Sequence, residues 1–352
     1  MKRTAVFFMT VCLVAFVCAA CAKVQTGEES CTRENLNKIT DKYFEAIQAH
    51  KTTDLPLAPT VKFTENGIVK EVGTGFWETA GKTLLRRTLV DTQKCTTATI
   101  AVIEEPFDSK TVGSGMMAGG GAPSGGAPAP AKTPAGPPAG ASGAPDGGGA
   151  FDMFSGPKEL PKEGTIRPIL FASRLKIENG KISEIETIIA REKEFAFNAD
   201  GVLKTKEQDW ETILPPEKQT PRQMLADAAN NYFALFAEDS TESVPFAKVC
   251  DRWENGVQTT ASDHDCSPVT FIKRLGMGMN HGPRRVWVDT EKGISIAFMV
   301  FMGGATANEQ NPTGSGLVDC HMFRMRDGEV DLIQSIVGPT APSMGWPLEP
   351  IE

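Results

Sequence analysis

The stretch Glu65-Asn66-Gly67 begins 22 residues after Tyr43 of a Tyr43-Phe44 pair, and the same arrangement occurs a second time. In the second copy, Glu254-Asn255-Gly256 follows Tyr232 at the same interval, and every member is displaced by 189 residues. Asn-Gly is a strong β-hairpin signal because both residues tolerate a positive φ. The pattern therefore predicts the same helix-then-hairpin unit twice.

A third pair of matching segments completes the repeat. Residues 175–182 match residues 323–330 at an offset of 148, so the two offsets differ by 41 residues. This difference is close to the length of a Gly/Pro/Ala-rich run from about Val112 to Ala150. Such a run has few side chains to bury, so we predict a disordered insert within the first copy. Without this insert, the chain consists of two copies of the same domain.

Composition bounds the possible functions. A chain of 352 residues with 40% hydrophobic residues has room for two ordinary domains, each with its own core. The net charge of -8 argues against nucleic acid and against an anionic membrane surface as partners. Past residue 22, no apolar run approaches the length needed to cross a bilayer.

The first 22 residues have the pattern of a secretory signal peptide. Lys2-Arg3 is followed by an apolar run and then by small residues. Cleavage after Ala20 would expose Cys21 for lipid attachment, as in a bacterial lipoprotein, whereas cleavage after Ala22 would give a freely secreted or periplasmic protein. We therefore expect an exported protein whose contact with membranes is a lipid anchor at Cys21.

The repeat also pairs the cysteines. Cys31 and Cys95 have no counterparts in the second copy, and Cys250 and Cys266 have none in the first. Cysteines that are present or absent together predict the disulfides Cys31–Cys95 and Cys250–Cys266, one in each domain. The alternative is that some are buried thiols, and Cys320 has no predicted partner.

Hydrophobic periodicity gives the elements. In the first copy it predicts a helix over 33–49, a hairpin around Asn66-Gly67, a second helix over 75–91, a strand over 96–104 and a hairpin over 166–189. In the second copy it predicts a helix over 222–237, the matching hairpin, a helix over 269–277 and three closing strands, the first of which runs from 285 through 302. The predicted domains are 31–200 with the insert at about 112–150, a connector over 201–217, 218–340, and a tail over 341–352.

These segments resemble the nuclear transport factor 2-like, or SnoaL-like, cone fold, and more closely a group of secreted tandem-cone proteins of unknown function that is frequent in fungi. The resemblance is carried by Cys31-Thr32-Arg33-Glu34, Thr64-Glu65-Asn66-Gly67, Leu89-Val90-Asp91-Thr92, Phe197-Asn198-Ala199-Asp200-Gly201, Cys250 ahead of Glu254, and His321 with Phe323-Arg324. It implies an α+β protein of two cone-shaped domains, each a curved antiparallel sheet wrapped on helices, packed as a pseudo-dimer within a monomer. Cone folds host enzymes and binding modules alike, so it does not assign a function.

Asp319 and His321 are the candidate catalytic pair. Residues two apart in a strand point to one face, and here that face also carries Phe323 and Met325. An inward histidine beside a carboxylate can act as a general base. The first copy has Phe171 and Ser173 at these positions. The alternative is a structural core histidine, with Asp319 at the exposed start of the strand.

Other motifs carry less chemistry. Turn chemistry explains the Asn-Gly pairs, so a catalytic role for Glu65 or Glu254 is a weaker hypothesis. The histidines show no zinc-type spacing, and we predict neither a metal nor a cofactor. The leading functional hypothesis is binding of a small apolar or amphipathic ligand or of a partner protein. The alternatives are a cofactor-free lyase, isomerase or hydrolase that uses Asp319 and His321, and a structural envelope protein.

Overall fold

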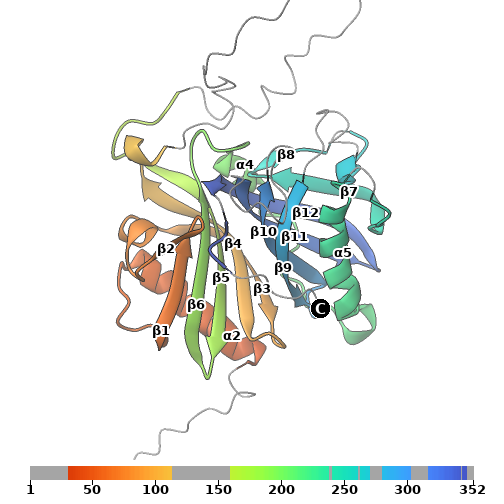
Figure 1. Cartoon of the computed structure of the whole chain (residues 1–352), viewed down its shortest axis with the longest axis horizontal. Coiled ribbons are helices and arrows are strands. Elements are labelled where there is room, and N and C mark those ends of the chain that lie inside the picture. The colour runs from red at the N-terminus through yellow and green to blue at the C-terminus, as the bar shows by residue number, and fades with distance from the viewer. Residues whose placement is uncertain are drawn as a thin grey trace, which may run out of the picture.

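The computed structural model describes residues 31–112, 159–237, 240–260, 262–269, 280–302, 316–341 and 343–346. The signal peptide, Cys21, the Gly/Pro/Ala-rich run after Val112 and most of the predicted helix over 269–277 lie outside these ranges. The described chain contains two similar α+β units (Figure 1).

The first unit contains α2 (Arg33–Gln48), β1 (Leu57–Glu65), β2 (Ile68–Lys70), η1 (Gly75–Glu78), β3 (Thr83–Asp91), β4 (Thr96–Pro106), η2 (Ser109–Thr111), β5 (Ile166–Glu178) and β6 (Lys181–Ala190). After α4 (Ala199–Lys204) and η3 (Pro216–Lys218), the second unit contains α5 (Arg222–Ala234), β7 (Phe246–Glu254), β8 (Val257–Gln258), β9 (Asn280–Asp289), β10 (Ile294–Met302), β11 (Gly316–Arg326) and β12 (Glu329–Ala341).

The two sheets have the same topology. Their strand orders are β2-β1-β6-β5-β4-β3 and β8-β7-β12-β11-β10-β9. In each sheet the first long strand pairs in parallel with the last, and the other pairings are antiparallel. Each sheet is six-stranded and mixed, and neither closes into a barrel, so the predicted repeat and fold class are confirmed.

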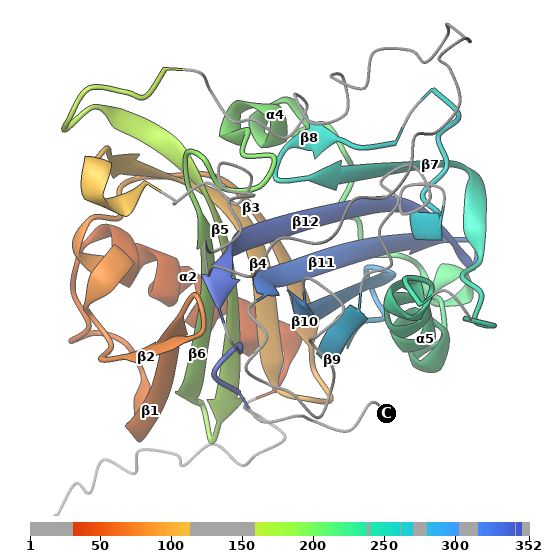
Figure 2. The same ribbon diagram turned by 45° about the horizontal axis from the view of Figure 1, so that its top comes forward.

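Each sheet is covered by its own helix on one face and by the other sheet on the opposite face. Helix α2 buries Leu36, Tyr43 and Phe44 against the inner face of the first sheet, and α5 does the same with Tyr232 and Phe233 on the second. The outer faces meet in an interdomain core that joins residues such as Leu170, Ile188, Phe298, Cys320 and Ile336. The strands of the two sheets cross where they meet (Figure 2).

Two predicted elements were wrong. The segment 75–91 is a short 3-10 helix followed by β3, not one helix. Leu85 and Leu89 fit a helical period, but a separation of four is even and also satisfies strand alternation. Both leucines face the interdomain core, while Val90 faces α2. The segment 83–91 pairs with β4 along its length, and these backbone hydrogen bonds favour the strand over the helix.

The stretch from Arg285 to Met302 forms two paired strands, β9 and β10, and not one. The turn between them contains Gly293 at φ +60°, where a Cβ atom would lie 2.8 Å from the carbonyl oxygen of Met325. Asp289 accepts the backbone N–H of Lys292 in this turn at 3.0 Å. The closing part of the second unit therefore has four strands in place of the predicted three.

The predicted cysteine pairs are the two disulfides of the described structure, Cys31–Cys95 and Cys250–Cys266. The first ties the start of α2 to the turn before β4, and the second ties β7 to the segment after β8. Disulfides of this kind form in oxidising compartments. Cys320 is buried in the interdomain core, and burial raises the pKa of its thiol.

Candidate functional site

The inner faces of the two sheets carry different residues at matching positions. In the first unit the interior is filled by aromatic rings: Phe76 packs on Phe171 with centroids 5.3 Å apart, and Trp77 contacts Tyr43 and Phe63. By the repeat offsets, the second unit has Arg252 in place of Phe63, Asp265 and Cys266 in place of Phe76 and Trp77, and Asp319 in place of Phe171. An aromatic plug in one copy is thus replaced by polar groups in the other.

Asp319 and His321 lie inside, as strand alternation predicts, and both side chains are fully buried. His321 Nδ1 lies 3.0 Å from Asp319 Oδ1, which fixes the orientation of the ring. The ring packs against Tyr232 and Phe233 of α5, with centroids 5.6 and 5.1 Å away. Asp319 therefore does not lie at an exposed strand start, and a carboxylate–imidazole dyad exists in an aromatic interior.

Glu254 belongs to the same cluster. On the inner face of the sheet, Glu254 of β7 is paired with Ser335 of β12, and Ser335 is paired with His321 of β11. His321 Nε2 lies 3.9 Å from Glu254 Oε1, which is longer than a hydrogen bond. Four polar residues, Glu254, Ser335, His321 and Asp319, thus form one buried patch that spans three adjacent strands.

Burial sets the electrostatics of this patch. Loss of solvent raises the pKa of Asp319 above its ordinary value; His321 opposes this shift and Glu254 adds to it. Burial likewise raises the pKa of Tyr232, which keeps its hydroxyl protonated. Removing charged groups from water is costly unless they are paired, so the cluster is not a source of stability by itself.

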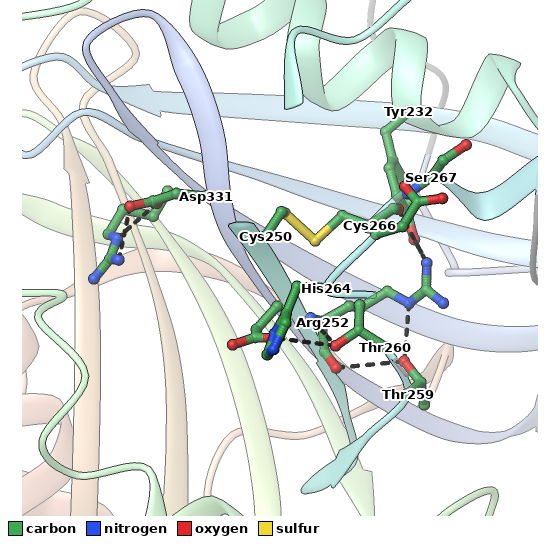
Figure 3. Close-up of a disulfide and its surroundings, with 12 residues drawn as sticks. Tyr232, Cys250, Arg252, Thr259, Thr260, His264, Cys266, Ser267 and Asp331 are labelled. Atoms are coloured by element: carbon green, nitrogen blue, oxygen red, sulfur yellow. Dashed lines mark hydrogen bonds and ion pairs between the residues drawn. A yellow bond between two sulfur atoms is a disulfide. The ribbon is translucent and has the colours of Figure 1, made fainter. Parts of the chain in front are cut away.

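Arg252 borders the patch, with its Nε 3.7 Å from Glu254 Oε1, and it lies beside the Cys250–Cys266 disulfide (Figure 3). Its guanidinium donates to Thr259 Oγ1 at 2.9 Å, to the carbonyl oxygen of Cys266 at 3.1 Å and to the hydroxyl of Tyr232 at 3.3 Å. The Cys250–Cys266 disulfide fixes that carbonyl relative to β7. His264 bonds Asp251 at 2.8 Å and is partly exposed, so it is not part of the buried patch.

The two glutamates of the Glu-Asn-Gly turns differ in their hydrogen bonding. In the first unit, Glu65 accepts from Lys70 Nζ and from the backbone N–H of Phe76, both at 2.8 Å. In the second, Thr259 and Asp265 occupy the positions of Lys70 and Phe76. Within the described ranges, Glu254 Oε2 and Ser335 Oγ are buried without a hydrogen-bond partner. Turn chemistry alone gave no signal for this difference; comparison of the two copies across the hairpin would have found it.

The fold and this patch define a class: a two-unit α+β protein whose second unit has a polar interior. A family model described as "Domain of unknown function (DUF8021)" matches residues 29–189 and 218–337, which is well over half of the chain. The chain belongs to this family. No curated protein matches it.

Among the residues that the structure describes, no helix is long and apolar enough to cross a membrane. The two disulfides indicate an oxidising environment.

Proposed function

We propose that the second unit binds a small amphipathic molecule in its interior. Its apolar part would pack against the rings of Tyr232, Phe233 and Phe323, and a hydroxyl or amine would donate to Glu254. The observation that supports this proposal most directly is that Glu254 Oε2 and Ser335 Oγ are buried without a hydrogen-bond partner in the described part of the chain. The matching Glu65 has two donors. Buried polar atoms in native proteins are normally paired, with protein, water or ligand.

The resemblance to SnoaL-like cone proteins supports this proposal, since small-molecule sites are concave and largely apolar with a few convergent polar groups. The first unit, with its aromatic filling, would then serve as the scaffold on which the second is mounted. Export follows the same reasoning: the disulfides and the signal-like N-terminus support a protein that works outside the cytoplasm, held by lipid at Cys21.

A pair of probes tests the binding site. We expect the purified protein to quench 2-naphthol, which has a donor hydroxyl, with a saturable one-to-one titration, and to bind naphthalene more weakly. Loss of a hydrogen bond to a charged group costs about 1.5–3 kcal/mol, so Glu254→Leu with Ser335→Ala, which removes both acceptors, should weaken 2-naphthol binding roughly 10- to 100-fold. Naphthalene binding should change little.

The matched control is Ser173→Ala, which removes a buried hydroxyl from the first unit and should leave both titrations unchanged. Equal binding of 2-naphthol by wild type and the double variant, with melting temperatures preserved, would show that the patch is not the site.

The dyad favours a second candidate, an acid–base enzyme. Asp319 orients His321 through Nδ1, and Nε2 then lies on the side of Glu254, whose Oε1 is 3.9 Å away. With p-nitrophenyl acetate as substrate, His321→Gln should lower turnover by roughly 10²–10⁴-fold if His321 is a general base. Turnover by the variant equal to that of wild type, or none by either protein, would leave binding as the function.

A further inference from the structure

The segment Ser343–Trp346, which follows the last strand of the second unit, reaches across to the first unit. Gly67 of the Asn66-Gly67 turn approaches it so closely that a Cβ atom there would lie 2.2 Å from the carbonyl oxygen of Ser343. Met344 of the segment is buried in the interdomain core. The last described residues of the chain thus close the contact between the two units.

Trp346 is held by a set of groups that match an indole ring. Its Nε1–H donates to Thr64 Oγ1 at 2.9 Å. Lys62 Nζ lies 4.0 Å from the ring centroid, and the guanidinium carbon of Arg174 lies 4.6 Å from it. Cations over an indole face attract its negative quadrupole, and tryptophan is the best side chain for this contact.

One of the two cations, Arg174, is fixed and neutralised by carboxylates of its own unit. Arg174 is fully buried and bonded to Glu186 at 2.9 Å and to Glu184 at 2.8 Å. Its guanidinium also lies 5.0 Å from the ring of Trp287, on the second unit, so it is stacked between two tryptophans. A rigid guanidinium loses little freedom when it binds a ring.

The matching place on the second unit has none of these features. There Asn198, after β6, packs on the Asn255-Gly256 turn, with its N–H donating to the carbonyl oxygen of Asn255 at 2.8 Å. By the repeat offsets, Asn198 replaces Trp346. The groups that correspond to Lys62, Thr64 and Arg174 are Asp251, Trp253 and Met322. In each unit the Asn-Gly turn is therefore covered by the segment that follows the last strand of the other unit. Only the first unit has residues that recognise an indole.

We propose that the first unit carries an indole-binding site, made by Lys62, Thr64 and Arg174 beside the Asn66-Gly67 turn, for which Trp346 is the resident ligand. The ligand class is an indole ring with a free N–H, on a peptide or alone. The half-buried position of Trp346 leaves the site reachable from solvent once that ring is removed. An indole-bearing molecule can therefore occupy the site when the ring of Trp346 is absent.

Chemical rescue tests this site in the full-length protein. Trp346→Ala should lower the melting temperature by roughly 4–10 °C, because a stacked, hydrogen-bonded indole is lost. Millimolar N-acetyl-tryptophanamide should restore part of this loss, since a ligand that binds the folded state stabilises it. N-acetyl-phenylalaninamide, whose ring has no N–H, should restore less. Wild type, whose site is filled, should not respond.

Met344→Ala is the matched control: it removes buried packing from the same segment but leaves Trp346 in place, so the tryptophan analogue should not rescue it. A wild-type melting temperature for Trp346→Ala, or an equal shift of wild type and variant by the analogue, would overturn the proposal.

If Trp346→Ala does not fold, a double-mutant cycle of Thr64→Val and Trp346→Phe tests whether Thr64 recognises the indole N–H. Non-additive losses in melting temperature support the site, and additive ones refute it.

Discussion

At the residue scale, the inner face of the second sheet differs in charge from that of the first at several matching buried positions. The positions of Phe171 and Ser173 become Asp319 and His321, and Phe63 becomes Arg252. Each change exchanges an apolar or neutral side chain for a charged or titratable one in a fully buried place. Because such exchanges cost stability, their clustering at one point is an argument for function and not for folding.

A second unusual residue lies outside this patch. Glu194 is buried in the segment between β6 and α4, and this burial raises its pKa to about 7, although Arg191 opposes the shift. Since the folded protein holds this proton more tightly than the unfolded chain does, the stability that it provides is complete below the unfolded pKa and is lost as the pH rises through 7.

Glu194→Gln should therefore match wild type at pH 4 and be more stable than wild type at pH 8, by on the order of 1–3 kcal/mol. Urea unfolding at both pH values measures this difference. Glu217→Gln, an exposed change, should leave stability unchanged at both. A stability difference at Glu194 that does not vary with pH would show that the carboxyl is ordinary.

At the element scale, each Asn-Gly turn does more than reverse the chain. Asn255 Oδ1 accepts the N–H of Val337, and Asn66 Oδ1 accepts that of Ile189, each at 2.8 Å. Each turn is also covered by the segment that follows the last strand of the other unit. The turns are thus both hairpins and interdomain contacts, which is why a side chain at the glycine has no room.

Gly256→Ala should cost more than 3 kcal/mol, because Gly256 has φ +87° and a Cβ atom would lie 1.9 Å from the carbonyl oxygen of Asn198. Gly164→Ala measures the cost of the positive φ alone, because Gly164 has φ +76° and nothing lies within 4 Å of the added atom. We expect it to lower the free energy of unfolding by about 1 kcal/mol. Chemical denaturation of both variants measures the difference. Equal losses would mean that the close approach is relieved at no cost.

At the scale of the whole molecule, the two units contact each other reciprocally. Arg33 at the start of α2 pairs with Asp289 at the end of β9, and Arg222 at the start of α5 pairs with Asp91 at the end of β3. The same carboxylates accept backbone N–H groups of the other unit, from Val90 and Val288, both at 2.9 Å. This is the pattern of a two-fold symmetric dimer interface within one chain.

Asp91→Ala and Asp289→Ala should each cost about 3–5 kcal/mol, because each removes a buried carboxylate that accepts from an arginine and from a backbone N–H of the other unit. The two losses should be similar, as the contacts are related by the repeat. Arg86→Ala, which breaks an exposed pair with Asp41, should change stability by less than about 1 kcal/mol. Urea titrations give all three values, and a loss at only one aspartate would contradict the reciprocity.

Much of this protein is determined locally, and the sequence predicts it. The spacing from Tyr43 to Glu65 and from Tyr232 to Glu254 gives the repeat, since a helix, a turn and their register are set by nearby residues. Strand alternation places Asp319 and His321 inside for the same reason. The cysteine pairs follow because matched copies show which cysteines were gained together.

Tertiary structure decided what depends on contacts between distant segments. A four-residue leucine spacing fits both helix and strand, so the pairing of β3 with β4 had to settle the segment 75–91. Glu254 joins His321 because β12 lies between β7 and β11, a neighbourhood that periodicity does not encode. Trp346 reaches Thr64, 282 residues away, only because the sheets pack face to face. Local patterns fix faces and turns, whereas sites that join several strands depend on the order in which those strands assemble.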